Sequence, residues 1–130
     1  MKRALMLLLA AVALRGDEFD DVRLRWRNTL TGGDADLTLA QVRSRLASVE
    51  TTARDYWNRL DKSAGRTLWT DLASATDSSA ITSNFRRIRD MALAWATPGQ
   101  GLYGNAELLT AVRGALDWME TNRYHALVTN

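Results

Sequence analysis

The sequence has no cysteine, one proline and one histidine among its 130 residues. Without cysteine, neither a disulfide framework nor a thiolate zinc site is available. No segment alternates polar and apolar residues over the length of a strand, so a β-sheet is not indicated. We also find no metal-ligand spacing, no glycine-rich phosphate loop and no nucleophile–base pair, and therefore predict no metal, no cofactor and no catalytic residue in this chain.

Lysine is scarce as well, because Lys2 and Lys62 are the only lysines among 17 basic residues. Arginine favours planar contacts to carboxylate, sulfate or phosphate, so this composition indicates an acidic partner, although genomic base composition explains the bias equally well. A nucleic-acid partner is not predicted, since Asp and Glu are interspersed through every predicted helix and the net charge is only +2. A hydrophobic content of 46% is that of a folded globular domain.

The N-terminus has the pattern of a secretory signal. Lys2 and Arg3 precede an apolar run from Ala4 to Leu14, and Ala11-Val12-Ala13 has the small-x-small form cut by signal peptidase. The run is too short to span a membrane, which needs about 20 residues. We therefore predict a signal peptide over residues 1–13, a mature domain over 14–130 and a secreted, extracellular protein that is not held in a membrane; a buried N-terminal helix is the alternative.

Hydrophobic periodicity predicts four helices. The first begins at a cap on Asp17 and ends at Gly32-Gly33, and Thr38 is the predicted cap of the second. Ser78 or Ser79 caps the third helix, which Thr97-Pro98-Gly99 stops, and Asn105 caps the fourth. Each helix has an apolar stripe predicted to be buried: Phe19, Val22, Trp26 and Leu30; Leu39, Val42, Leu46, Val49, Ala53, Tyr56 and Leu60; Ile81, Phe85, Ile88, Ala92 and Trp95; and Leu109, Val112, Leu116 and Met119.

Between the second and third helices, residues 61–79 read as a long connection with one short helical turn and Trp69 as its anchor. The other four tryptophans lie on or beside the helical stripes, so core packing is favoured over sugar stacking for them. The five are Trp26, Trp57, Trp69, Trp95 and Trp118.

The predicted fold class is all-α, with antiparallel helical hairpins stacked side by side. These hairpins form either a complete four-helix bundle or the opening part of a larger helical ring. In the second case the last hairpin must expose an apolar strip, and we expect marginal stability or self-association through that exposed helix face.

An ordered series of motifs carries a resemblance to a known family. The series is the segment Phe19 to Gly33 with its Arg-x-Arg-Trp-Arg and Thr-Gly-Gly, then Ile81 to Gly99, Leu102-Tyr103-Gly104, Leu116-Asp117-Trp118-Met119 and Asn122-Arg123-Tyr124. It resembles the N-terminal α-domain of family eight polysaccharide lyases, which comprise hyaluronate, chondroitin AC and xanthan lyases. The resemblance covers nearly everything after the signal-like segment.

The resemblance implies a secreted enzyme that cleaves uronic-acid-containing polysaccharides by β-elimination. It also implies that these helices open an incomplete α/α toroid followed by β-sheet domains. In the family, an Asn, a His, a Tyr and Arg residues form the catalytic set, and an Asn-Trp-Trp motif opens the cleft. This sequence reaches Asn130 without a Trp pair, so we expect the chain to be truncated before the catalytic motifs.

Two residues are candidate substrate-binding residues. Arg86 follows Phe85 in a pair that resembles the place where the family supplies a substrate-contacting arginine, and Asn130 matches the first residue of the cleft motif. A solvated charge on a helix face is the alternative for Arg86. Tyr124 and His125 do not match the catalytic motif and are interpreted as a surface pair at a helix end.

The leading hypothesis is thus the N-terminal part of a secreted polysaccharide lyase, contributing part of a cleft for an acidic glycan of hyaluronan, chondroitin or xanthan type. A non-catalytic helical carbohydrate-binding or scaffold protein is the second. A helical interaction domain with accidental similarity is the third.

Overall fold

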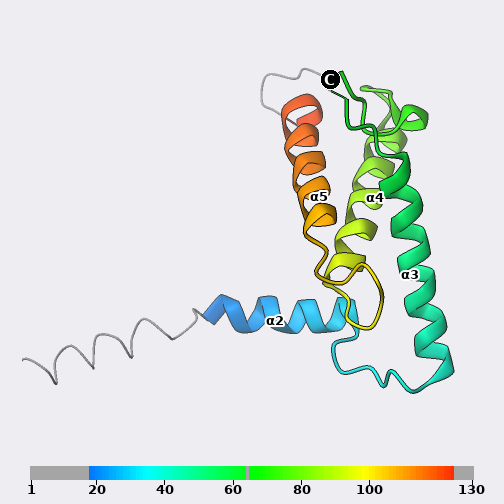
Figure 1. The fold of residues 1–130 in the computed structure, drawn as a ribbon. Coiled ribbons are helices and arrows are strands. Elements are labelled where there is room, and N and C mark those ends of the chain that lie inside the picture. The colour runs from blue at the N-terminus through cyan, green and yellow to red at the C-terminus, as the bar shows by residue number, and fades with distance from the viewer. Residues whose placement is uncertain (1–17, 64, 125–130) are drawn as a thin grey trace, which may run out of the picture. The chain divides into compact units, whose positions relative to one another are not determined.

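A computed structural model of the protein describes residues 18–63 and 65–124, in which every regular element is helical. This confirms the all-α prediction for the described part of the chain. The α-helices are α2 (Glu18–Thr31), α3 (Ala40–Arg59), α4 (Ser78–Ala96) and α5 (Ala106–Met119), with a 3₁₀ turn at Thr70–Leu72 and a π-helical turn at Glu120–Tyr124 (Figure 1). The predicted signal peptide over residues 1–13 and the cap at Asp17 lie outside the described residues.

The chain divides into two compact units at Gly33. In the first unit, α2 ends as its glycines predict: Gly32 adopts a φ of 61°, and the Gly33 N–H donates to the Asn28 carbonyl at 3.1 Å. A left-handed residue followed by this backward hydrogen bond satisfies a terminal helix carbonyl, and glycine adopts that backbone without steric cost.

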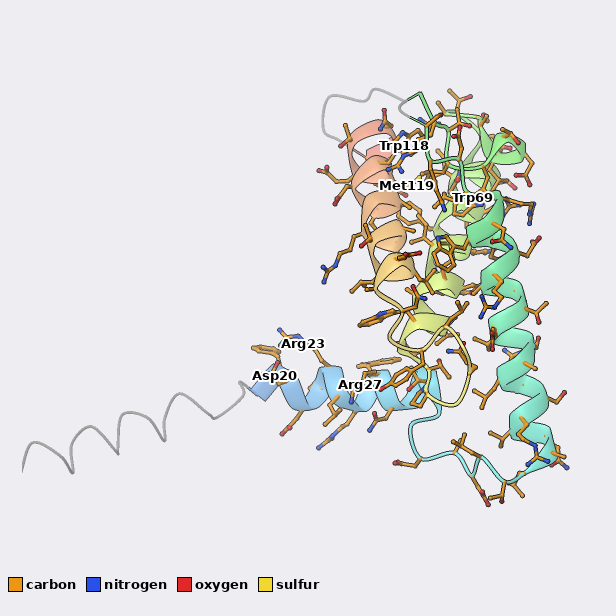
Figure 2. All side chains as sticks on the ribbon, in the orientation of Figure 1. Asp20, Arg23, Arg27, Trp69, Trp118 and Met119 are labelled. Atoms are coloured by element: carbon orange, nitrogen blue, oxygen red, sulfur yellow. The ribbon has the colours of Figure 1, made fainter. Side chains whose placement is uncertain are left out.

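Within the first unit, the residues of the apolar stripe of α2 are exposed, so Trp26 packs in no core formed by that unit itself. Trp26 is 63% exposed and Leu30 64%, and Phe19 and Val22 on the same face are also exposed. Burial of such a stripe requires a partner surface, and a helical pattern does not specify one. On α2 the charged side chains include an ion pair between Asp20 and Arg23 (Figure 2).

We expect the chain to self-associate through this α2 face. The double substitution Trp26→Glu and Leu30→Glu should raise the dissociation constant of the self-associated form at least about tenfold, because it charges two large apolar contacts. Sedimentation velocity over a concentration series measures this, with Thr29→Glu, an exposed substitution on the same helix, as the matched control. A wild-type chain that stays strictly monomeric would contradict the expectation.

In the second unit, α3 begins one residue later than the predicted cap allows. The Thr38 hydroxyl donates to the Asp36 carboxylate at 2.6 Å, and the Thr38 N–H donates to the same oxygen at 2.8 Å. These two hydrogen bonds lower the pKa of Asp36. Leu39 is therefore the N-cap, without a side-chain cap, and its own side chain is exposed rather than buried as predicted.

Helix α4 contacts both α3 and α5, and the three pack around one core (Figure 1). In α5 the predicted stripe residues Val112 and Met119 are buried, with Leu108 and Ala115 beside them, whereas Leu116 is 43% exposed. Trp57, Trp95 and Trp118 pack partly buried against the core, as predicted. The fully buried core residues are Ala53, Leu60, Leu68, Trp69, Ile88, Met91, Ala94, Leu102, Leu108, Val112, Ala115 and Met119.

The caps of the last two helices are polar side chains. Asp77, rather than the predicted Ser78 or Ser79, caps α4 by accepting the Ser79 N–H at 2.9 Å. Asn105 caps α5 as predicted, with its side chain accepting the Leu108 N–H at 2.9 Å. Helix α4 ends at Ala96 with Thr97 as its C-cap, in agreement with the predicted Thr97-Pro98-Gly99 stop.

The loop between α4 and α5 is tied to both neighbouring elements. The Gly104 N–H donates to the Trp95 carbonyl at 2.9 Å and so satisfies one of the last carbonyls of α4. The Gly101 N–H donates to the Glu50 carboxylate of α3 at 2.8 Å. This hydrogen bond, followed by that from Arg54, lowers the pKa of Glu50. The Leu102-Tyr103-Gly104 motif therefore belongs to a fixed turn.

The connection between α3 and α4 is ordered around Trp69, as predicted. Trp69 is 1% exposed, and its indole N–H donates to the Tyr56 carbonyl at 2.9 Å (Figure 2). Asn84 is fully buried in α4 and donates to the Leu72 carbonyl at 3.1 Å, while Arg123 donates to the Ala73 carbonyl at 3.2 Å. These side chains hold the connection against the bundle.

Candidate functional site

The three arginines of the Phe85-Arg86-Arg87-Ile88-Arg89 segment have different environments. The Arg87 side chain is only 14% exposed and forms a bidentate ion pair with Asp71. Its Nη1 donates to Asp71 Oδ1 at 2.8 Å, and its Nη2 donates to Asp71 Oδ2 at 2.5 Å. Its guanidinium also lies over the rings of Tyr56 at 5.1 Å and Trp69 at 5.4 Å. Arg87 therefore holds the connection in place, and its hydrogen bonds, followed by its charge, lower the pKa of Asp71.

Arg86 and Arg89 are exposed and lie one turn apart on α4, where residues three apart share a face. Arg89 donates to the neighbouring Asp90 carboxylate at 2.9 and 2.7 Å. Arg86 makes no hydrogen bond or ion pair to any part of the chain that the structure describes. Its guanidinium is thus available to a ligand, and its role in binding substrate stays a prediction.

A groove lies between α3 and α4, with a volume of about 200 Å³. We call it the α3–α4 groove. Its lining consists of Arg45, Ser48, Val49 and Thr52 from α3 and Arg89, Asp90 and Leu93 from α4. Arg86 does not line the groove, but it precedes the lining residue Arg89 by one turn on the same face of α4.

The charges and hydroxyls of the α3–α4 groove suit a carboxylated, hydroxyl-rich ligand. Arg45 and Arg89, with Arg86 beside them, supply three guanidinium groups against the single carboxylate of Asp90. Guanidinium forks bind carboxylates in a planar, bidentate geometry, and charge-assisted hydrogen bonds are about twice as strong as neutral ones. Ser48 and Thr52 add hydroxyls that donate and accept.

The remaining sequence candidates are placed as follows. Asn130 and His125 lie outside the described residues. The Tyr124 ring is exposed and meets Phe85 edge-on at a centroid distance of 5.4 Å. Arg45 was not identified from the sequence, because a charge between apolar positions of α3 looks like an ordinary solvated residue until α4 is packed beside it.

The described residues contain neither a metal-binding cluster nor a membrane-spanning helix. No group of three or more His, Cys, Asp or Glu side chains there is placed to hold a metal ion. Among the same residues, no helix combines the length and apolar character needed to cross a membrane.

Comparison with known families gives one match over most of the chain. The model of the polysaccharide lyase family 8 N-terminal α-helical domain matches residues 26–130. The described helices α3, α4 and α5 and most of the quoted motifs lie within that range.

Individual relatives agree with the family match. A xanthan lyase from a Bacillus species is 38% identical over 117 residues, covering 88% of this chain and 13% of its own length. A hyaluronate lyase from Thermasporomyces composti is 37% identical over 113 residues, covering 86% of this chain and 14% of its own. A solved Paenibacillus xanthan lyase aligns with a TM-score of 0.82 at 35% identity, over 88% of this chain and 11% of that one. The chain thus spans only a small part of the lyases it matches.

Proposed function

Because the chain belongs to polysaccharide lyase family 8, whose N-terminal α-helical domain it represents, we propose that it contributes one wall of a cleft that binds a uronic-acid-containing polysaccharide. In this proposal its helices open an incomplete α/α toroid, and the polysaccharide is of hyaluronan, chondroitin or xanthan type. Cleavage is by β-elimination, carried out by residues other than those of this chain. The relatives named xanthan lyase and hyaluronate lyase support this substrate class.

The observation that carries the proposal is the cationic α3–α4 groove. β-Elimination beside a uronate requires the carboxylate to be neutralised, a base to take the α-proton and an acid for the leaving oxygen. Arg86, Arg89 and Arg45 supply cations that bind and neutralise a carboxylate. No base is needed for that contribution, and the chain is proposed to bind the polysaccharide without cleaving it.

The proposal includes export of the protein. The supporting pattern is the basic pair Lys2-Arg3 followed by the apolar run to Leu14, with cleavage after Ala13. An extracellular enzyme meets polymeric glycans that do not enter cells, so the compartment and the substrate class fit one another.

The test is a binding measurement with arginine variants. Arg86→Gln combined with Arg89→Gln should weaken binding of a hyaluronan hexasaccharide about 10- to 100-fold, because each removes charge-assisted hydrogen bonds to a carboxylate. Isothermal titration calorimetry measures the affinity, and raising the salt concentration should weaken the wild type more than the variant. Arg113→Gln, at an exposed arginine of α5, is the matched control.

Two results would count against the proposal. Equal affinities of the wild type and the double variant for the hexasaccharide would mean that the α3–α4 groove does not belong to the substrate cleft. Appearance of the ultraviolet absorbance of an unsaturated uronate during incubation with hyaluronan, chondroitin sulfate or xanthan would contradict the statement that this chain binds without cleaving, and would direct attention to Tyr124 and His125.

A further inference from the structure

A second and larger groove lies on a different part of the bundle. Its volume is about 410 Å³, and its lining comes from the end of α3, the connection and α5. We call it the Trp57 groove. The residues that matter for its chemistry are Trp57, Lys62, Arg66, Glu107, Thr110 and Gly114. It shares no lining residue with the α3–α4 groove.

The cations of the Trp57 groove face it from the connection. The Lys62 ammonium lies 5.6 Å from the centroid of the Trp57 ring. Arg66 donates through Nη2 to the Gly114 carbonyl at 2.5 Å, which fixes its guanidinium at the groove and uses one of five donors. Within the described residues, no salt bridge joins Lys62 or Arg66 to a carboxylate.

Gly114 keeps this part of the groove open. A Cβ at Gly114 would meet Arg66 Nη2 at 3.6 Å, an ordinary contact distance, so a longer side chain would enter the space in front of the guanidinium. Glycine is otherwise a poor residue for the interior of α5, costing about 1 kcal/mol relative to alanine. The missing side chain thus leaves room beside a fixed cation.

We propose that the Trp57 groove is a second, non-catalytic subsite that binds an acidic sugar residue of a polysaccharide. The half-buried Trp57 ring, over which Lys62 lies, forms an apolar wall of the groove, and Lys62 and Arg66 pair with the anionic group of the sugar. Glu107 and Thr110 accept hydrogen bonds from sugar hydroxyl groups. The volume lies in the range of small-ligand sites. The choice of an acidic polysaccharide rests on the proposed function.

The anionic group could be a uronate carboxylate or a sulfate ester, since both accept hydrogen bonds from the same cations. Three probes separate them: a hyaluronan hexasaccharide carries carboxylates alone, a chondroitin sulfate hexasaccharide carries both groups, and a dextran oligosaccharide carries neither. Binding of both acidic probes without dextran supports a carboxylate site. Binding of the sulfated probe alone assigns the groove to sulfate.

The experiment uses the indole N–H signals of the 130-residue chain in two-dimensional ¹⁵N NMR spectra, with the Trp57 signal assigned through Trp57→Phe. The acidic probes should shift this signal. Lys62→Gln with Arg66→Gln should weaken the titration at Trp57 at least about tenfold, as expected for the loss of two charged contacts. Gly114→Met should abolish it by filling the groove. Arg113→Gln should leave it unchanged.

The variants separate the two proposals. If Arg86→Gln with Arg89→Gln weakens overall binding while the Trp57 signal never moves, the Trp57 groove is not a subsite and the proposed function stands. If the Trp57 signal titrates and only the Lys62 and Arg66 variant weakens it, the subsite stands independently of the α3–α4 groove. If no acidic probe binds at all, both proposals are overturned.

Discussion

Trp69→Ala is expected to destabilise the folded chain by about 3–5 kcal/mol, as large-to-small substitutions of buried aromatic residues do. Trp69 is 1% exposed, and its indole N–H satisfies the Tyr56 carbonyl near the end of α3. The last four carbonyls of a helix have no partner within the helix, so the substitution leaves a cavity and also an unsatisfied acceptor. The Arg87 guanidinium loses one of its two ring contacts as well.

Urea denaturation followed by circular dichroism measures this effect. The matched control is Trp26→Ala, the same change at a residue that is 63% exposed, where the free energy of unfolding should change by less than about 0.5 kcal/mol. Equal effects of the two substitutions would mean that Trp69 does not anchor the connection. Lys62 and Arg66, which line the Trp57 groove, lie on the same connection. Trp69→Phe keeps an aromatic ring at this position, so it is the milder variant for testing whether the Trp57 groove depends on Trp69.

Asn84→Asp is expected to destabilise the folded chain by about 3 kcal/mol or more at neutral pH, although the two side chains have nearly the same shape. Asn84 is fully buried and donates through Nδ2 to the carbonyls of Leu72 at 3.1 Å and Ala80 at 3.0 Å. An aspartate places a carboxylate oxygen against two carbonyl oxygens and buries an unpaired charge, which costs several kcal/mol.

The pH dependence of this variant follows from burial. Burial raises the pKa of a carboxyl group, so the folded variant holds its proton at pH values where the unfolded chain has lost it. Stability of Asn84→Asp relative to the wild type should therefore fall as the pH rises above the unfolded pKa of about 3.9. Thermal melts from pH 3.5 to pH 8 measure this. A pH-independent difference between variant and wild type would argue against a buried carboxylate.

Asn58→Asp serves as the control for the same chemical change at an exposed site of α3. It lies near the C-terminus of that helix, where a negative charge is unfavourable by a few tenths of a kcal/mol. A loss of stability similar to that of Asn84→Asp would mean that the charge alone, and not its burial against carbonyl groups, is responsible.

The helices themselves follow from local chemistry. Gly32-Gly33, Thr97-Pro98-Gly99 and Asn105 act as predicted because left-handed glycine, proline restriction and side-chain capping each operate within a few residues. Two predicted caps were wrong because a neighbouring polar side chain took part instead. Asp36 accepts the hydrogen bond of the Thr38 hydroxyl, and Asp77, rather than Ser78 or Ser79, caps α4. Such competition depends on backbone geometry, and composition does not reveal it.

The candidate site was only partly predictable. The resemblance predicted Arg86 as a binding residue, whereas the pairing of the neighbouring Arg87 with Asp71, sixteen residues earlier, was not predictable from the sequence. Arg45 joins Arg89 in a groove only because α3 and α4 pack against each other. Asn84 was overlooked because its partner carbonyl at Leu72 belongs to a segment without periodicity.

The sequence by itself determined that the chain is helical, where most helices begin and end, and which family it belongs to, because periodicity, capping and ordered motifs are properties of neighbouring residues. The tertiary structure alone decided which residues of a stripe are buried, so that in α5 Leu108 and Ala115 are buried with Val112 and Met119 whereas Leu116 is exposed. It also decided which arginines are available to a ligand. Burial and pairing depend on surfaces brought together from distant parts of the chain, and a local pattern specifies a face but not what covers it.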